Sequence, residues 1–268
     1  MHGISIKAEP LFEIFGVTIT NSILLGILGI VIVISWLAFT AHAVKKDRDG
    51  LARKGFFTRL ALWCFEGLYK TIHDVIPNKK VARQVAPFAI TIFFIVAIQY
   101  YTGVLPFVGE AVTWGEHALF RSQAADLNFT VMLAIITIIA VQVWAIKVLG
   151  SKANFERYFI NPIKDPIGSF SGLLEIIAEF SRLIALAMRL FGNVFAGEVL
   201  LIVVAYLGQY ASPAILPLFY IFELFIGGIQ AYVFFMLATV FVGLAVEHGG
   251  HHEPDHSAEA KRMSEITT

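Results

Sequence analysis

The chain has 268 residues, of which 57% are hydrophobic and only 15% are charged, and its formal net charge is zero. A soluble domain carries roughly a quarter charged residues, and a neutral total gives no strong attraction to nucleic acid. The composition therefore favours a membrane protein that binds no nucleic acid. Cys64 is the only cysteine, which excludes an internal disulfide and a metal site built from paired cysteines.

The N-terminal part of the chain predicts one membrane span and one surface helix. Residues 1–20 lack the basic start and apolar run of a cleavable signal peptide, so the first span is expected to be retained. Residues 21–44 contain no charged side chain and are long enough for one span, which needs about 20 residues. Residues 56–76 mix charged and apolar residues at helical spacing. We interpret them as a helix at the membrane interface; a soluble connecting helix is the alternative.

Two further apolar segments, 85–105 and 127–146, predict the second and third spans. The loops at 45–59 and 147–165 are basic, whereas the loop before Asp126 is acidic. Positive loops favour the cytoplasmic side of a membrane. We therefore expect residues 1–20 and 103–126 outside, and residues 45–84 and 147–168 inside.

Two much longer apolar stretches follow, 170–207 and 213–246, joined by a short turn at 208–212. Ser212 is a candidate cap for the second helix, and Pro213 suits a first helical turn. As helices they would be about 57 Å and 51 Å long, whereas the hydrocarbon core is ~30 Å thick. We expect a strongly tilted antiparallel hairpin, with a kink near Gly192 or Gly197 as the alternative.

The predicted architecture is a single all-α membrane domain of about five transmembrane helices plus an interfacial helix. It divides into an external N-terminus (1–20), peripheral spans and loops (21–168), a helix hairpin (169–247) and a polar tail (248–268). The tail holds four histidines, which raise the possibility of a metal site. We favour a solvated tail and no metal, because no acidic ligand pattern accompanies the histidines.

Ionisable side chains gather in the two long helices. Such groups are costly inside a membrane and by default mark a functional path. The first helix carries Glu175, Glu179, Arg182, Arg189 and Glu198; the second carries Glu223 and Gln230. Glu179 and Arg182 are neighbours on a helix, and Glu175 lies two turns before Arg182. These three are read either as part of a proton path or as a structural ion-pair cluster.

Arg189 has no acidic neighbour on its own helix. Its neighbours one turn away on either side are Ala185, Leu186, Gly192 and Asn193. Arginine cannot become neutral by losing its proton, so a carboxylate must come from elsewhere. Small residues share the face of Arg189 and allow another helix to approach. We infer a carboxylate on a second chain; a pair with Glu198 or Glu223 of the same chain is the alternative.

Arg189 and Gln230 lie half-way along their predicted helices, so an antiparallel hairpin brings them to the same depth. Glu198 and Glu223 lie outward of this depth, and Glu175 and Glu179 lie inward. A carboxyl group in low dielectric binds protons more readily than in water, which suits Glu198 and Glu223 as relay groups. A simple interhelical hydrogen bond between Glu223 and Gln230 is the alternative.

The run RLFGNVFAGE at residues 189–198 resembles the signature of subunit a of the F-type ATP synthase, the stator half of the membrane motor. The run IQAYVF at 229–234 is similar to the final helix of that family, and Asn161-Pro162 also fits. The resemblance is strong over residues 161–246. Elsewhere it extends only to the order of the spans.

The resemblance implies a mechanism in which protons enter an outer half-channel and reach an acidic residue on a rotating ring of c subunits. That residue releases its proton to an inner half-channel on reaching Arg189, which matches the family's essential arginine. Asn193, Glu198, Glu223 and Gln230 match outer positions, while Glu175 matches the acidic residue at the inner exit and Arg182 a basic position nearby. Some relatives carry histidine in place of Glu223, so the order of proton transfers stays open.

The resemblance further implies a c-subunit ring, a b-subunit peripheral stalk and, indirectly, the F1 sector as partners. It implies no cofactor and no catalytic site within this chain. We favour a bacterial inner (plasma) membrane location over a thylakoid membrane. The competing interpretation is a secondary transporter or self-contained ion channel, which also has polar groups at the membrane midplane. An intramembrane hydrolase is dismissed, because the glycine-rich run 168–172 has Phe170 where a nucleophilic serine is needed.

Overall fold

The computed structural model describes residues 10–14, 17–46, 55–105, 108–114, 117–158 and 166–247. Its long helices are α1 (Asn21–Lys46), α2 (Phe56–Val75), α3 (Lys79–Gly103), α4 (Leu127–Leu149), α6 (Pro166–Gly208) and α7 (Ser212–Glu247). The helix α5 (Ser151–Tyr158) is short. The tail at 248–268 lies outside the described residues, so the interpretation of its histidines stays a prediction.

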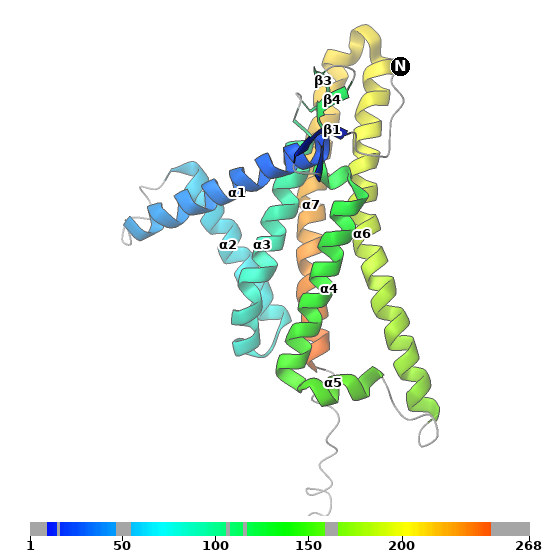
Figure 1. Cartoon of the computed structure of the whole chain (residues 1–268). Coiled ribbons are helices and arrows are strands. Elements are labelled where there is room, and N and C mark those ends of the chain that lie inside the picture. The colour runs from blue at the N-terminus through cyan, green and yellow to red at the C-terminus, as the bar shows by residue number, and fades with distance from the viewer. Residues whose placement is uncertain are drawn as a thin grey trace, which may run out of the picture.

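The helices form a bundle from which α1 projects (Figure 1). The helix α3 packs against α1, α2 and α7, while α4 packs against α6 and α7. Gln99 of α3 donates a hydrogen bond of 2.9 Å to the backbone carbonyl of Gly26 in α1. Because α1 runs at a steep angle to α3, α4 and α7, these helices cannot all stand upright in one membrane.

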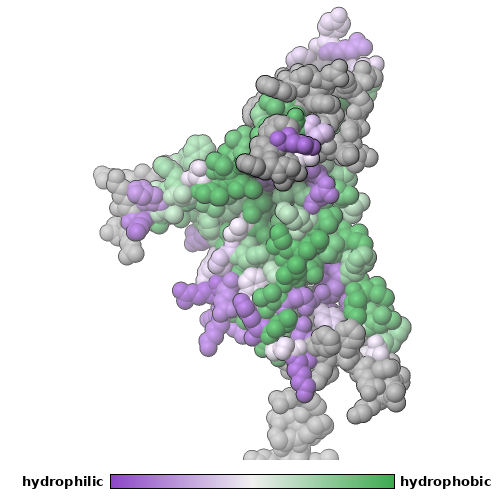
Figure 2. Space-filling view, viewed as in Figure 1, coloured by the Kyte–Doolittle hydropathy of each residue, from purple (hydrophilic) through white to green (hydrophobic). Residues whose placement is uncertain are grey.

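Within the described residues, α1, α3, α4 and the continuous α6–α7 segment are long and apolar enough to cross a membrane. Large apolar side chains are exposed along them, and one face of the molecule is accordingly apolar over α1 and the middle of α4 (Figure 2). Surfaces of this kind are solvated by lipid rather than water. The structure therefore confirms the predicted α-helical membrane fold.

The last two helices are long, as predicted, with 43 residues in α6 and 36 in α7. At 1.5 Å per residue they measure about 64 Å and 54 Å, which requires a tilt in a hydrocarbon core of ~30 Å. The helix α6 continues through both Gly192 and Gly197. The two helices pack against each other as the predicted antiparallel hairpin (Figure 1).

The turn between α6 and α7 differs from the prediction that Ser212 caps the second helix. The hydroxyl of Ser212 instead donates a hydrogen bond of 2.7 Å to the carbonyl of Ala205, near the end of α6. Gln209 has a φ of 44°. Ser212 therefore satisfies a free carbonyl at the end of the first helix, and the reversal depends on a left-handed residue that is not glycine.

Several boundaries and elements differ from the sequence prediction. The helix α3 starts before residue 85 because the side chain of Asn78 accepts hydrogen bonds from the backbone of Lys80 and Val81. The short helix α5 and two antiparallel β-hairpins were not predicted from the sequence. The first pairs β1 (Pro10–Ile14) with β2 (Val17–Thr20), and the second pairs β3 (Gly109–Trp114) with β4 (His117–Phe120). Both lie near the end of the bundle that holds the α6–α7 turn (Figure 1).

The helix α2 has one buried side, formed by Ala61, Leu68 and Ile72, and several exposed apolar residues near its start. This described helix contains no segment apolar enough to span a membrane. Its position at the membrane interface and the division of the chain into the segments given above stay predictions.

The packing of α3 against α7 depends on a close approach at Gly227. A Cβ atom there would lie 2.5 to 3.0 Å from ring atoms of Tyr100. We predict that Gly227→Ala destabilises the protein by about 1–3 kcal/mol, since overpacking forces neighbouring groups apart. The measurement is the thermal unfolding midpoint of the purified protein in detergent. Gly67→Ala in α2 is the control, because its Cβ would meet nothing within 4 Å. Equal midpoints for both variants would contradict the prediction.

Candidate functional site

The side chain of Arg189 is exposed on the surface of α6. Within the described part of the chain, no hydrogen bond or ion pair joins it to another residue. Ala185 and Ala196 are also exposed on this helix, one turn inward and two turns outward of Arg189. Arg189 thus forms no ion pair with Glu198 or Glu223, the alternative that the sequence had left open.

One turn outward of Arg189, the two long helices are joined by a polar contact. The side-chain amide of Asn193 donates a hydrogen bond of 2.6 Å to Oε1 of Gln230. Gln230 is buried, and its Nε2 atom has no hydrogen-bond partner among the described residues. Gln230 thus contacts Asn193, which follows Arg189 by one helical turn.

Glu223 is enclosed between α3, α6 and α7. Its side chain is only 3% exposed, and the hydroxyl of Tyr100 donates a hydrogen bond to its carboxylate. A Cβ atom at position 197 of α6 would collide with this carboxylate, so Gly197 provides the space that Glu223 occupies. The bond that Glu223 makes is thus with Tyr100, and the alternative of a Glu223–Gln230 bond is not found.

Glu198 lies beside the short helical turn η2 (Gln123–Ala125) that precedes α4. Its carboxylate accepts a hydrogen bond from the backbone N–H of Ser122 and lies within electrostatic reach of Arg121 and Glu223. The outer end of the hairpin therefore holds two carboxylates near one another, and one of them is close to a cation.

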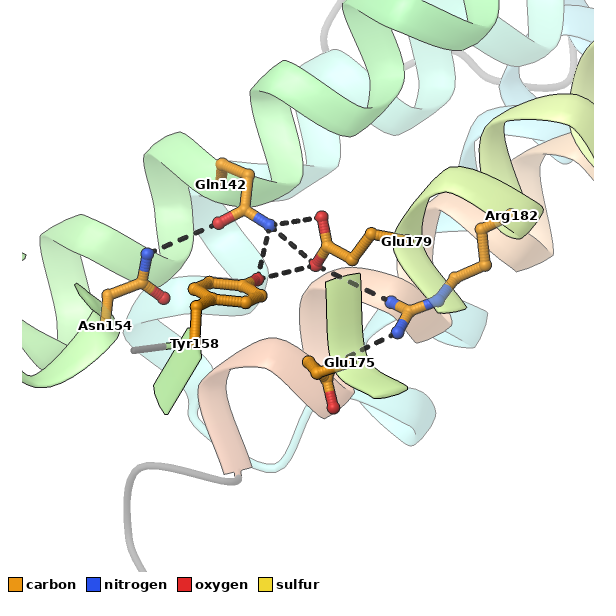
Figure 3. Close-up of polar contacts among 6 residues, drawn as sticks. All are labelled: Gln142, Asn154, Tyr158, Glu175, Glu179 and Arg182. Carbon is orange, nitrogen blue, oxygen red and sulfur yellow. Dashed lines mark hydrogen bonds and ion pairs between the residues drawn. The ribbon is translucent and has the colours of Figure 1, made fainter. Parts of the chain in front are cut away.

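A second cluster surrounds the inner half of α6 (Figure 3). The guanidinium of Arg182 lies 3.2 Å from Oε1 of Glu175 and 4.0 Å from Oε1 of Glu179. It also lies over the ring of Phe241 in α7, 5.3 Å from the ring centre. The structure thus brings together the three ionisable residues that the sequence analysis had grouped.

Three residues of α4 and α5 that contact this cluster were not predicted from the sequence. Nε2 of Gln142 lies 2.6 Å from each carboxylate oxygen of Glu179, and the hydroxyl of Tyr158 donates to Oε1 at 2.8 Å. Asn154 donates to the other end of the Gln142 amide at 3.3 Å. Gln142 alone carried a signal, as a polar residue in the apolar segment 127–146.

The arrangement places polar groups on both sides of an unpaired cation in an apolar helix pair. Outward of Arg189 lie the Asn193–Gln230 contact and the carboxylates of Glu198 and Glu223. Inward lies the cluster of Glu175, Glu179 and Arg182. Carboxyl groups and amides of this kind can bind, donate and accept protons or hold water. The described residues contain no group of three or more His, Cys, Asp or Glu side chains suited to a metal ion.

Comparisons with known proteins find similar sequences that belong to one family. A family model described as "ATP synthase A chain" matches residues 23–243. ATP synthase subunit a of Enterococcus hirae is 34% identical over 192 residues, which is 69% of this chain and 77% of the relative. ATP synthase subunit a 2 of Vibrio campbellii is 29% identical, over 87% of this chain and 90% of the relative. Subunit a of Acidothermus cellulolyticus is 28% identical, over 78% and 73% respectively.

The bond between Tyr100 and buried Glu223 predicts a stability effect. Tyr100→Phe removes the donor and leaves the carboxyl group without its partner, which costs roughly 1–3 kcal/mol. We expect a lower thermal unfolding midpoint in detergent. Tyr69→Phe is the control, since Tyr69 is exposed on α2. If both phenylalanine variants unfold at the wild-type temperature, the bond does not stabilise the fold.

Proposed function

The chain belongs to the ATP synthase A chain family, the membrane stator subunits of F-type ATP synthases, and we propose that its α6–α7 hairpin moves protons to and from a rotating ring of c subunits. In this proposal Arg189 faces an acidic residue of the ring, and two half-channels connect that residue with opposite sides of the membrane. The observation that carries the proposal is an exposed Arg189 with no ion-pair partner in the described chain.

The physical argument begins with the cost of that charge. An arginine in the middle of a membrane helix costs several kcal/mol when isolated, about 2.5–3.5 kcal/mol even on insertion scales. Its side chain cannot escape this cost by releasing a proton. A carboxylate on a neighbouring chain removes the cost by pairing with it, and the exposed position of Arg189 on α6 leaves room for such a neighbour.

The surface around Arg189 suits a closely packed helix. Ala185 and Ala196 flank it, and small side chains let two helix backbones approach. Farther outward the same face continues with the exposed residues Leu200, Val203 and Leu207. A ring of hairpins whose carboxyl groups travel past this face in their neutral form would meet mostly apolar and small side chains, with the charge of Arg189 and the amide of Asn193 among them.

The outer half-channel is assigned to Glu198, Glu223, Asn193 and Gln230. Glu198 and Glu223 lie close enough to influence each other electrostatically, and Asn193 and Gln230 are directly bonded. The unpartnered Nε2 atom of Gln230 is a donor for water on this route. Tyr100 joins the set because its hydroxyl contacts Glu223.

The inner half-channel is assigned to Glu175, Glu179 and Arg182, which lie on the other side of Arg189 along α6. A proton delivered to the ring from outside must travel around it before leaving here, because the fixed charge of Arg189 opposes direct proton passage. Each charge that crosses a potential of 100 mV supplies about 2.3 kcal/mol. This energy drives the ring in one direction.

As a subunit of the ATP synthase, the chain works in a complex with other subunits, and its apolar helices make it a multi-pass membrane protein. We infer that its partners are the c-subunit ring, the b-subunit peripheral stalk and, through these, the F1 sector. Similarity to subunits from Enterococcus, Vibrio and Acidothermus supports a location in a bacterial inner (plasma) membrane.

Replacement of Arg189 tests the proposal. We expect Arg189→Ala to abolish proton-driven ATP synthesis in membrane vesicles while the complex still assembles, since an exposed side chain contributes little to folding. Arg189→Lys is also expected to fail, because lysine loses its proton in apolar surroundings. The exposed Arg83→Ala in α3 is the control. Substantial coupled synthesis by Arg189→Ala would refute the assigned role.

Replacement of Glu223 tests the outer route. Glu223→Gln keeps the size of the side chain but cannot carry a proton, so we expect proton entry from the outer side to slow by about tenfold or more. The rate of proton entry is measured as acidification, or as the response of a dye that reports it, in vesicles whose proton gradient is applied from the outer side. Glu66→Gln on the exposed face of α2 should leave the rate unchanged. An unaltered rate in Glu223→Gln would remove this residue from the path.

A further inference from the structure

Glu179 is held by neutral hydrogen-bond donors from two other helices (Figure 3). Nε2 of Gln142 lies 2.6 Å from both of its carboxylate oxygens, and the hydroxyl of Tyr158 lies 2.8 Å from Oε1. The charged neighbour Arg182 is farther away, at 4.0 Å. The carboxylate is thus fixed mainly by the contacts of Gln142 and Tyr158.

The donors are themselves held in place. Nε2 of Gln142 lies 2.9 Å from the hydroxyl of Tyr158, and Oε1 of Gln142 accepts a hydrogen bond of 3.3 Å from Asn154. Asn154 and Tyr158 both belong to α5, which connects α4 to the inner end of α6. These three residues, termed the α4–α5 clamp, therefore lock the orientation of Glu179 from outside α6.

Arg182 divides its contacts unequally between the two carboxylates. It lies 3.2 Å from Glu175 and 4.0 Å from Glu179, and the ring of Phe241 supports its guanidinium. The side chain of Glu175 is 25% exposed, compared with 16% for Glu179. Glu175 is therefore both the more accessible carboxylate and the one that Arg182 contacts more closely.

We propose that the α4–α5 clamp holds Glu179 as a fixed carboxylate, or anchor, that does not compete for Arg182, so that Arg182 stays against Glu175, and that Glu175 alone of the two carboxylates carries protons at the inner exit. Gln142 and Tyr158 are then positioning residues. The proposal rests on the proposed function, because it narrows the set of residues assigned to the inner half-channel.

Two physical reasons support this division of roles. A proton carrier must exchange hydrogen-bond partners in each cycle. Glu179 is poorly suited to this role, because it would have to break its contacts with both Gln142 and Tyr158 each time. Without the clamp, Glu179 would need a new hydrogen-bond donor. Arg182 could supply it, because the two residues are three positions apart on one helix and can pair directly. Arg182 would then be drawn away from Glu175, so the clamp keeps the arginine available to the exit.

The first test compares two glutamine variants in the complete ATP synthase, with ATP synthesis normalised to the amount of assembled complex. Glu179→Gln keeps one acceptor oxygen for the clamp but cannot carry a proton, and we expect a smaller loss of ATP synthesis than in Glu175→Gln. Glu175→Gln removes the carrier, and we expect a loss of about tenfold or more. A loss in Glu179→Gln as large as that in Glu175→Gln would overturn the anchor role.

The second test uses rescue, which a purely structural defect would not show. Gln142→Leu leaves Glu179 without its main donor, and we expect about a tenfold loss of synthesis per assembled complex. The double variant Gln142→Leu with Glu179→Leu removes the competing charge as well, and the rate should recover. Gln84→Leu, at an exposed position of α3, is the control. A double variant no faster than Gln142→Leu would overturn the proposal.

These results separate failure of the anchor role from failure of the proposed function. If Arg189→Ala abolishes synthesis but Glu175→Gln is fully active, the motor assignment stands and the carrier role of Glu175 is wrong. If Arg189→Ala retains ATP synthesis, the proposed function itself is wrong. Passive proton conduction through vesicles stripped of F1, measured for the same variants, reports directly on the exit and should follow the same order.

Discussion

The proposed function depends on one permanent cation that has no ion-pair partner among the described residues. Arg189 lies exposed on an apolar helix, and among the described residues none pairs with it. The guanidinium keeps its charge at any physiological pH, and hydrocarbon solvates it poorly. In the proposed function, a carboxylate on a neighbouring chain pairs with Arg189, and its arrival and departure control the release of a proton. The family membership of the chain agrees with this interpretation.

The surrounding helices provide polar contacts without opening the apolar interior. Gly197 leaves the space that the Glu223 carboxylate fills, and Tyr100 reaches it from α3. On the inner side, Gln142 and Tyr158 satisfy Glu179 from α4 and α5. Buried polar groups are costly unless they are hydrogen-bonded. The peripheral helices therefore do more than enclose the hairpin, because they supply the partners that keep its carboxylates inside the membrane.

Charge and length patterns made the hairpin and its ionisable residues predictable from sequence. The unpaired state of Arg189 followed from its neighbours at helical spacing. The partners from other helices were not predictable, because Tyr100 and Tyr158 carry no signal that separates them from interface aromatic residues. The exact contacts between the two long helices, such as Gly197 with Glu223 and Asn193 with Gln230, were not predictable, because helical spacing gives only their approximate register. Short elements such as α5 and the two β-hairpins were not predicted, because they lack a long apolar pattern.

Disulfide crosslinking tests most directly whether the Arg189 face meets an acidic ring helix. Cys64 is the only native cysteine, so Cys64→Ser gives a background without reactive thiols. In that background, Ala196→Cys is oxidised together with a cysteine placed beside the acidic residue of the c subunit. Our account predicts a crosslink there and none from Val194→Cys, which is buried within the chain. A crosslink from Val194→Cys without one from Ala196→Cys would contradict the account.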